Sequence, residues 1–367
     1  MSNFKFEQLS EMALKVISKD FNKHCEVMNI EDSWVRTTLF QNLNIKNANI
    51  DILCAKIKHE EFWSLACKKM YSTSVPENNS SHKSLYLENY LQNYLRKTKQ
   101  MNADELMDIM HQIGKFIISL RITDQRADEL LGTVFPFLVN IQSLRLNVYS
   151  KNNKLFDTKN FGMTDLVLTD LTNSFRSFSK LRKLDLSNNQ LDSSKIEILC
   201  QGICFLKELE SLNLSRNKID NLALETLNQE GNLGLCKKLQ VIDLSGNELV
   251  EGCGKTLEEL VFNTKNSLKC IYLQGNLISN SDLAKICNAF IIHNSLINEI
   301  NLANNVLDES SFAVILNFLE NCKKLKFVDL EMNLMKLCTT QVESLNAIMA
   351  NNFAGKIVFN FDYVISD

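Results

Sequence analysis

The sequence predicts an α/β solenoid of horseshoe type, with a parallel sheet on its concave face, helices on its convex face and an all-α segment before it. Three observations predict this fold. The pattern L-x-x-L-x-L-x-x-N-x-L occurs six times in the second half of the 367-residue chain. A segment with the hydrophobic period of a helix follows each occurrence. The first 112 residues contain no copy of the pattern and show helical periodicity instead.

The six copies recur at an almost constant period. They begin at Leu181, Leu209, Leu239, Leu268, Ile297 and Leu325. Successive copies therefore begin 28, 30, 29, 29 and 28 residues apart. A constant period of this length is typical of an array in which each unit contacts only its neighbours. We expect residues 113–367 to form this array and residues 1–112 to form a helical domain or cap.

Each position of the pattern has a physical role. The L-x-L core predicts a short strand whose alternate side chains point into the core and away from it. The Asn at the ninth position turns the chain, and its amide can bond the main chain of the neighbouring unit. We therefore predict a buried ladder of six amides: Asn189, Asn217, Asn247, Asn276, Asn305 and Asn333.

The period leaves room for one strand and one full helix in each unit. Helical segments such as SSKIEILCQGICFL and SDLAKICNAFIIHN follow the Asn, and several open with Ser or Asp, which favour helix N-termini. In these motifs, residues 115–361 resemble the ribonuclease-inhibitor-like leucine-rich repeats. The resemblance implies a curved solenoid that binds another protein on its concave face.

Atypical units flank the six complete copies. FIISLRITDQRADELL, from Phe116, and NIQSLRLNVYS, from Asn140, match the strand part of the pattern but lack the Asn. A polar insertion at 150–161 precedes the first complete copy. At the far end, KIVFNF at 356–361 predicts a closing strand. Atypical end units are expected because each end of an array must cover an otherwise bare apolar face.

The N-terminal helices carry a second, partial resemblance. Residues 30–71 resemble the end of an F-box, through Leu39-Phe40 and a later helix that contains Trp63. The resemblance implies a Skp-type adaptor as partner, with Leu39, Phe40 and Trp63 as candidate adaptor contacts. The Leu-Pro opening of that family is missing, so a plain helical cap on the first repeat is our preferred interpretation. A polar stretch at 72–84 predicts an exposed loop.

Composition and charge argue against several functional classes. The net charge of −3 and the pI near 6.0 create no field that attracts nucleic acid. No apolar run approaches the roughly 20 residues that span a bilayer, and the first residues lack the apolar run of a signal peptide. We therefore expect a cytoplasmic protein without a nucleic-acid partner and without membrane insertion. Most of the 11 cysteines lie in apolar helical stretches, which predicts buried free thiols.

The sequence contains no complete motif for cofactor binding or catalysis. No C-x-x-C pair and no histidine spacing typical of metal ligands occurs, so we predict no metal site and no cofactor. Gly254-Lys255-Thr256 resembles the end of a phosphate loop, but Leu249 occupies the place of that motif's first Gly. We predict no enzymatic activity. The alternative is an enzyme whose catalytic groups lie unrecognised in residues 1–112.

The side chains expected on the concave face follow from the pattern. Aromatic and Met side chains exposed on a rigid sheet are the types that anchor protein interfaces, and carboxylates around them favour a basic or mixed partner surface. Asp or Asn between the leucines is also common in such repeats, so it partly reflects the fold. The candidate partner-binding residues are Asp185, Arg216, Asp243, Cys270, Tyr272, Asn301, Phe327, Asp329 and Met332.

Three uses of a protein-binding solenoid follow from the resemblances. The first is a scaffold or an inhibitor that covers its protein partner. The second is an F-box-like substrate receptor of a ubiquitin ligase. The third is an effector that an intracellular bacterium delivers into the host cytosol, which the Asn-, Lys- and Ile-rich composition allows.

Overall fold

The structure, a computed structural model, describes residues 40, 50–72, 81–97, 102–123, 130–147, 162–229, 231–293, 295–351 and 356–358. The chain divides into two compact units. Unit 1 comprises Met1–Leu120 and Thr133–Ile141, and unit 2 comprises Arg121–Gly132 and Gln142–Asp367. The division thus lies beyond residue 112, where the sequence predicted the end of the helical domain.

Two contacts explain why Thr133–Ile141 group with unit 1. The Asn140 amide donates a hydrogen bond to the Lys115 carbonyl at 2.7 Å, and the His111 and Phe137 rings meet edge to face at 4.6 Å. These contacts join segments about 25 residues apart. The hydrophobic periodicity of the sequence does not predict such contacts. The boundary between the units was therefore beyond what the pattern could predict.

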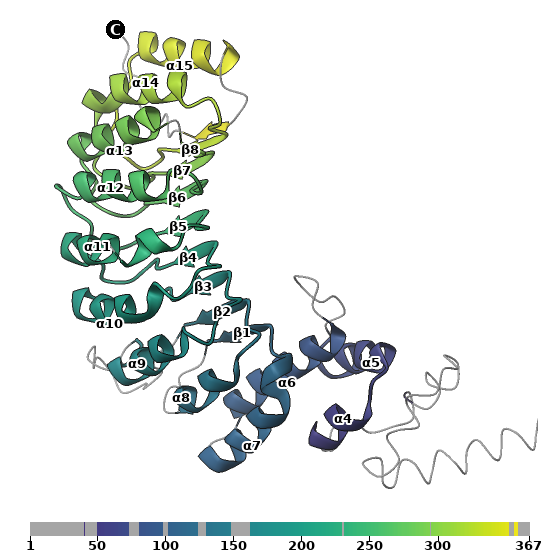
Figure 1. Cartoon of the computed structure of the whole chain (residues 1–367). Helices are drawn as coiled ribbons and strands as arrows, with labels where there is room; N and C mark the ends of the chain where they lie inside the picture. The colour runs from purple at the N-terminus through teal and green to yellow at the C-terminus, as the bar shows by residue number, and fades with distance from the viewer. Residues whose placement is uncertain are drawn as a thin grey trace, which may run out of the picture. The chain divides into compact units, whose positions relative to one another are not determined.

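Unit 2 contains the predicted sheet, apart from the first two residues of its first strand, which belong to unit 1 (Figure 1). Among the described residues the sheet has nine strands in sequential order, and β2 to β9 pair in parallel. The strands are β1 Ser119–Ile122, β2 Ser143–Leu146, β3 Lys183–Asp185, β4 Ser211–Asn213, β5 Val241–Asp243, β6 Cys270–Tyr272, β7 Glu299–Asn301, β8 Phe327–Asp329 and β9 Lys356–Val358. Strand β9 confirms the first half of the predicted closing strand, whereas residues 359–361 and the insertion at 150–161 lie outside the described residues.

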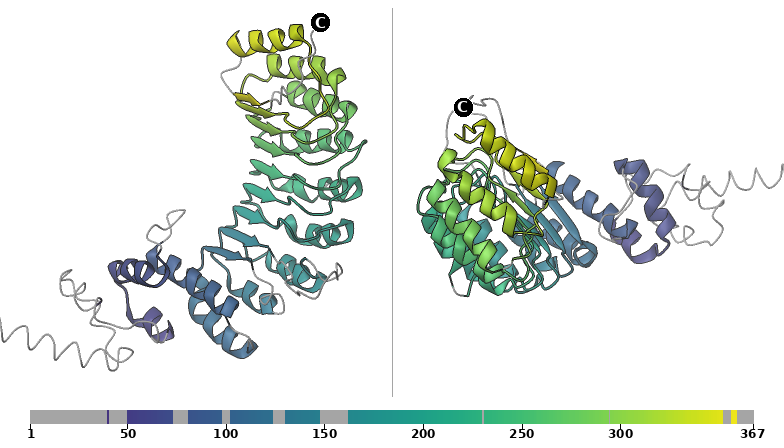
Figure 2. Two further views of the ribbon diagram at one scale, coloured as in Figure 1. Left: turned by 180° about the vertical axis from the view of Figure 1, so that it is seen from behind. Right: turned by 90° about the horizontal axis from the view of Figure 1, so that it is seen from above.

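One helix follows most strands and returns the chain to the start of the next strand. The helices are α9 Asp165–Ser174, α10 Ser193–Ile203, α11 Asn221–Asn228, α12 Gly254–Thr264, α13 Asn280–Ile292, α14 Phe312–Asn321 and α15 Thr339–Asn351, with 3-10 turns at Leu233–Leu235 and Glu309–Ser311. Figure 1 and the left view of Figure 2 show α9–α15 along one side of unit 2 and the strands along the other. The helix N-caps are Asp192, Asp220 and Ser279, whose side chains accept main-chain N–H groups of the first turn. For α10 and α13 the cap thus lies one and two residues before Ser193 and Ser281, where the predicted helical segments opened.

The apolar positions of the pattern form the core between the sheet and the helices. The central residue of each strand from β3 to β8 is at most 1% exposed, in the register Leu184, Leu212, Ile242, Ile271, Ile300 and Val328. Burial of one such side chain contributes roughly 1.5–3 kcal/mol. The same position in every coil therefore forms a continuous apolar column along the solenoid.

The predicted asparagine ladder is present. The Asn217 Oδ1 atom accepts hydrogen bonds from the main-chain N–H groups of Asn189 at 2.8 Å and Leu191 at 3.1 Å. Its Nδ2 atom donates to the carbonyls of Leu186 and Leu214 at 3.1 and 2.8 Å. The amides of Asn247, Asn276, Asn305 and Asn333 bridge successive coils in the same way. Each side chain thus replaces hydrogen bonds that the turning main chain cannot make with itself.

The residue before each ladder Asn has a left-handed backbone. The φ angles are 57°, 53°, 62°, 68°, 51° and 57° at Asn188, Arg216, Gly246, Gly275, Asn304 and Met332. Gly and Asn tolerate this conformation well, whereas at Arg216 and Met332 the Cβ atom makes it sterically unfavourable. This recurrent turn is what carries the chain from the strand into the loop before the helix.

Unit 1 is helical, as predicted. Its described elements are α4 Ile50–Lys56, α5 Glu60–Tyr71, α6 His82–Lys97, α7 Ala103–Ile113 and the 3-10 turns Gly114–Phe116 and Phe135–Phe137. The loop predicted at 72–84 is wrong at its end, because α6 already begins at His82. The Ser81 hydroxyl accepts the main-chain N–H of Ser84 at 3.1 Å, which is how a serine caps a helix.

The carboxylate of Glu88 joins α6 to the chain segment that enters β1. Glu88 is buried, and its Oε1 atom accepts hydrogen bonds from the main-chain N–H groups of Ile118 at 2.9 Å and Ser119 at 2.7 Å. A buried carboxylate needs such donors to offset its lost hydration. Glu88 therefore fixes the end of unit 1 just before the sheet starts.

None of the helices in the described ranges is both long and apolar enough to cross a membrane.

Candidate protein-binding surface

Two rows of side chains cover the face of the sheet that points away from the helices, called here the open face. The buried central residue of each strand points inward, so its two neighbours point outward. The first row runs through Arg145, Asp185, Asn213, Asp243, Tyr272, Asn301 and Asp329. The second row runs through Ser143, Lys183, Ser211, Val241, Cys270, Glu299 and Phe327. The structure thus brings seven of the nine predicted partner-binding residues into these two rows.

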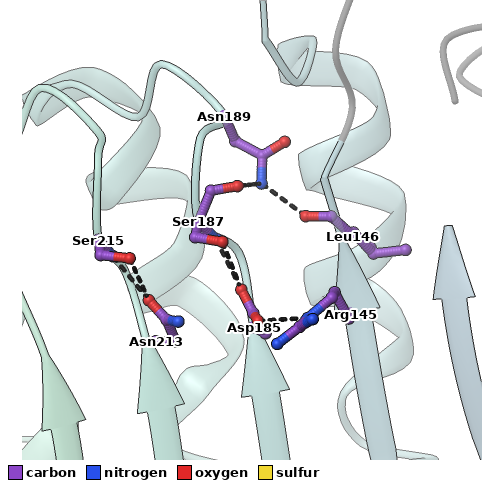
Figure 3. Close-up of polar contacts among 7 residues, drawn as sticks. All are labelled: Arg145, Leu146, Asp185, Ser187, Asn189, Asn213 and Ser215. Carbon is purple, nitrogen blue, oxygen red and sulfur yellow. Dashed lines mark hydrogen bonds and ion pairs between the residues drawn. The ribbon is translucent and has the colours of Figure 1, made fainter. Parts of the chain in front are cut away.

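The Asp and Asn side chains of the first row end their own strands. In each case Oδ1 accepts the main-chain N–H of the residue two positions later, at 2.9–3.1 Å. The residues that do so are Asp185, Asn213, Asp243, Asn301 and Asp329. Figure 3 shows this turn at Asp185 with Ser187 and at Asn213 with Ser215. The Oδ1 atom of each of these five side chains therefore stabilises the fold itself through an Asx turn.

Two of the first-row carboxylates also have a side-chain partner. The Arg145 Nε atom lies 2.5 Å from Asp185 Oδ2 (Figure 3), and the Asn301 amide donates to Asp329 Oδ2 at 3.1 Å. Arg145 was not among the predicted residues, because its unit lacks the ladder Asn. Its place between Leu144 and Leu146 was the signal that could have found it. The Arg145–Asp185 pair neutralises the first-row charge at this end of the sheet.

Tyr272 occupies the first-row position where five other strands carry an Asp or Asn. A phenol has no carbonyl oxygen near the main chain and cannot form the Asx turn. Its hydroxyl instead lies near Glu299 and Cys270 of the second row, which both affect its pKa. The Cys270 Sγ atom also lies 3.8 Å from Glu299 Oε2 and 3.5 Å from Asn298 Oδ1. Tyr272 thus replaces the Asx turn of the row with a side chain that lies in a surface cluster with Cys270 and Glu299.

The electrostatics of this cluster favour recognition over catalysis. Burial raises the pKa of Tyr272, and the nearby Cys270 and Glu299 raise it further. Burial also raises the pKa of the Cys270 thiol, with the Glu299 carboxylate adding to the effect. A protonated thiol and a protonated phenol are weak nucleophiles, and the phenol is a good hydrogen-bond donor whereas the thiol is a weak one. Glu299, which the sequence did not single out, is the acceptor that organises both.

Arg216 and Met332, the other two predicted residues, lie one turn beyond the strands at the left-handed position. Both side chains are exposed, Met332 to 68%. A large side chain kept at a position that prefers Gly or Asn costs about 1 kcal/mol. The conformation itself recurs before every ladder Asn and belongs to the fold, so only the large side chains of Arg216 and Met332 are left unexplained by it.

Met332→Gly is expected to increase the free energy of unfolding by about 0.5–1 kcal/mol, since Gly removes the strain of the left-handed backbone. Urea-induced unfolding of the full chain measures the change. Leu334→Gly is the matched control, because Leu334 is exposed two positions later without a positive φ. That variant should lose stability, and an equal loss in Met332→Gly would contradict the strain argument.

Two of the three candidate adaptor contacts, Phe40 and Trp63, are buried in unit 1. Trp63 is fully buried and Phe40 is 4% exposed, while Leu39 lies outside the described residues. The Phe62 ring lies edge-on to both Phe40 and Trp63, with centroids 5.7 and 5.3 Å away. Phe40 and Trp63 therefore expose almost no surface, and the adaptor contact predicted for them stays a prediction. Their aromatic character is used to build the core of unit 1.

The segment that resembled a phosphate loop already holds an anion from its own chain. The buried Asp282 Oδ1 atom accepts the main-chain N–H groups of Gly252 at 3.1 Å and Gly254 at 2.9 Å. A Cβ atom at Gly254 would lie 2.6 Å from the Asp282 Cα atom, so only Gly fits there. The loop amides that would bind a phosphate are thus occupied by the neighbouring coil.

The cysteines of the described residues are free thiols, as predicted. No group of three or more His, Cys, Asp or Glu side chains in the described ranges is placed to hold a metal ion. Burial raises the pKa of six described thiols in unit 2, including Cys270 and Cys287. The pKa rises to about 11 for Cys236 and to about 12 for Cys200, Cys253 and Cys322.

These raised pKa values predict a loss of stability in alkali. Between pH 9 and pH 11 the unfolded chain releases thiol protons that the folded chain retains, so the free energy of unfolding falls as pH rises. Each thiol contributes at most about 1.4 kcal/mol per pH unit. Urea unfolding under reducing conditions at pH 8 and pH 10 measures the fall. Cys236→Ala should show a fall smaller by about 1 kcal/mol, and an equal fall would contradict the assignment.

The comparison with protein families agrees with this geometry. Residues 180–201, which contain β3 and the start of α10, match the family model described as Leucine Rich Repeat. No curated protein matches the sequence of the whole chain. With the matched segment, the sequential parallel sheet and the returning helices, the fold of unit 2 is that of a leucine-rich-repeat solenoid.

Proposed function

We propose that the chain is a protein-binding module whose partner docks on the open face of the leucine-rich-repeat sheet. The observation that supports this most is the position of Tyr272. Five other strands use that position for an Asx turn, so the fold provides no reason for an aromatic residue there. Tyr, Met and Phe are frequent interface anchors.

Phe327 adds to this argument. It occupies the second row of β8, next to Glu299 in the register, and is partly exposed on the open face. The strands beneath these side chains are short, in register and supported by a buried apolar column. Such a rigid support keeps the entropic cost of binding low.

The finer role extends the same proposal. By resemblance to ribonuclease-inhibitor-like repeats, the module acts as a scaffold or an inhibitor that covers its protein partner. An action in the cytoplasm, including that of a bacterial effector in a host cytosol, stays a prediction from the sequence. The F-box alternative has lost the support of Phe40 and Trp63.

Tyr272→Ala combined with Phe327→Ala is expected to abolish capture of the partner, because interface anchors of this kind each contribute about 2 kcal/mol or more. Affinity purification with the full chain, followed by quantitative mass spectrometry, provides the measurement. The control replaces Phe205 and Leu222, two exposed apolar residues off the open face, with Ala. Proteins retained by the wild type and the control but lost with the double variant support the proposal. The same proteins captured by all three would refute it.

A further inference from the structure

We propose that the partner presents an arginine or lysine, flanked by apolar side chains, to one defined part of the open face. This part is called here the acidic–aromatic patch and consists of Asp243, Tyr272, Glu299, Phe327 and Asp329. The inference rests on the proposed function and deepens it, since it specifies the chemistry of the partner at that site.

The charge distribution over the open face is uneven. Strands β5 to β8 carry three carboxylates at the outward positions and no Lys or Arg at any of them. The opposite holds for β2 and β3, where Arg145 pairs with Asp185 and Lys183 stands beside them. The negative charge of Asp185 is therefore neutralised by Arg145. The three carboxylates of the patch have no Lys or Arg beside them at the outward positions of β5 to β8.

The members of the patch lie within reach of one ligand side chain and its neighbours. Adjacent strands are about 4.8 Å apart, so β5 to β8 span roughly 14 Å. Tyr272 is in register with Asp243 on one side and Asn301 on the other, and Glu299 stands between Cys270 and Phe327 in the second row. The Glu299 side chain therefore has the Cys270 thiol on one side and the Phe327 ring on the other, with Tyr272 near it in the first row.

The patch is organised before any partner arrives. The Cys270 thiol lies 3.8 Å from Glu299 Oε2, with the Tyr272 hydroxyl close by, and the Asn301 amide donates to Asp329 Oδ2 at 3.1 Å. The Oδ1 atoms of Asp243 and Asp329 are fixed by their Asx turns at 2.9 and 3.1 Å. Side chains already held in place lose little entropy on binding, which raises both affinity and specificity.

A cation fits this arrangement better than other ligands. A neutral apolar partner would bury the three carboxylates without compensation, which is costly. An acidic peptide, a nucleic acid or an anionic membrane would be repelled. A guanidinium can bond a carboxylate with two N–H groups and stack on an aromatic face, while the aliphatic stem lies along the rings.

The test uses a defined probe with a neutral twin. The full chain is labelled with 3-fluorotyrosine, and the Tyr272 signal in the fluorine NMR spectrum is assigned by its absence in Tyr272→Phe. The probe is the peptide acetyl-Leu-Arg-Leu-Arg-Leu-amide. In the twin, citrulline replaces each arginine, which keeps the shape and removes the charge.

The arginine peptide is expected to shift the Tyr272 signal and to bind about five-fold or more tightly than the citrulline peptide. Glu299→Gln should lower the affinity for the arginine peptide by a similar factor. Glu225→Gln, which removes an exposed carboxylate on α11, should change it less than two-fold. Equal binding of the two peptides, an unmoved Tyr272 signal, or equal effects of the two Glu variants would each overturn the inference.

Failure of this inference is distinguishable from failure of the proposed function. If the double variant of Tyr272 and Phe327 loses its partner while both peptides bind equally, the open face binds a protein but does not select a cation. If the double variant keeps every partner, the open face is not the docking surface, whatever the peptides do.

Discussion

Asn217→Leu is expected to lower the free energy of unfolding of unit 2 by about 3–5 kcal/mol. The Asn217 amide accepts two main-chain N–H groups and donates to carbonyls of two coils. Leucine fills a similar volume but leaves these groups buried without partners, at about 1–3 kcal/mol for each. Urea unfolding of the full chain, followed by circular dichroism, measures the loss.

Asn266→Ala serves as the control for this variant. Asn266 is exposed after α12 and has no place in the ladder, so its replacement should change the free energy by less than about 0.5 kcal/mol. Should Asn217→Leu remain within 1 kcal/mol of the wild type, the ladder would not be a main source of stability. Because neighbouring coils stabilise one another, a large loss at one coil should also spread to its neighbours.

Asp282→Ala is expected to cost a similar amount, about 3–5 kcal/mol. Its Oδ1 atom accepts the N–H groups of Gly252 and Gly254, and its Oδ2 atom accepts the Ser279 hydroxyl at 2.7 Å. Removal of the carboxylate leaves two loop N–H groups of one coil and the cap of α13 unsatisfied. The measurement is again urea unfolding of the full chain.

Two further variants make the Asp282 prediction specific. Asp282→Asn keeps an acceptor oxygen and should lose roughly half as much stability. Asp165→Ala removes an exposed acid from the first turn of α9 and should lose less than about 0.5 kcal/mol. Equal stability of Asp282→Ala and Asp165→Ala would show that the carboxylate does not hold the two coils together.

The periodic features of the protein were predictable because they depend on residues at equivalent positions. Every ladder Asn bonds the coil next to it, and the leucine columns repeat at the same step. A period visible in the sequence thus translates directly into contacts between neighbours. The strands at Ser119 and Ser143 were also found in this way, although their units lack the Asn.

The candidate site was only partly predictable. The pattern identified which residues point outward, including Tyr272, Cys270 and Phe327. It did not reveal that Asp185 and Asp243 each use one oxygen in an Asx turn, or that Glu299 lies near the Tyr272 hydroxyl. These facts depend on side-chain geometry between strands, which a one-dimensional pattern does not contain.

The sequence by itself determined the solenoid, its sheet order and its amide ladder, because a repeat of constant length forces equivalent residues into adjacent columns. Only the tertiary structure decided what non-equivalent residues do. It buried Trp63 in unit 1, filled the loop at Gly254 with Asp282, and neutralised Asp185 with Arg145 while Tyr272 and Glu299 remained on the open face. The reason is that burial and charge pairing arise from contacts between distant residues that share no period.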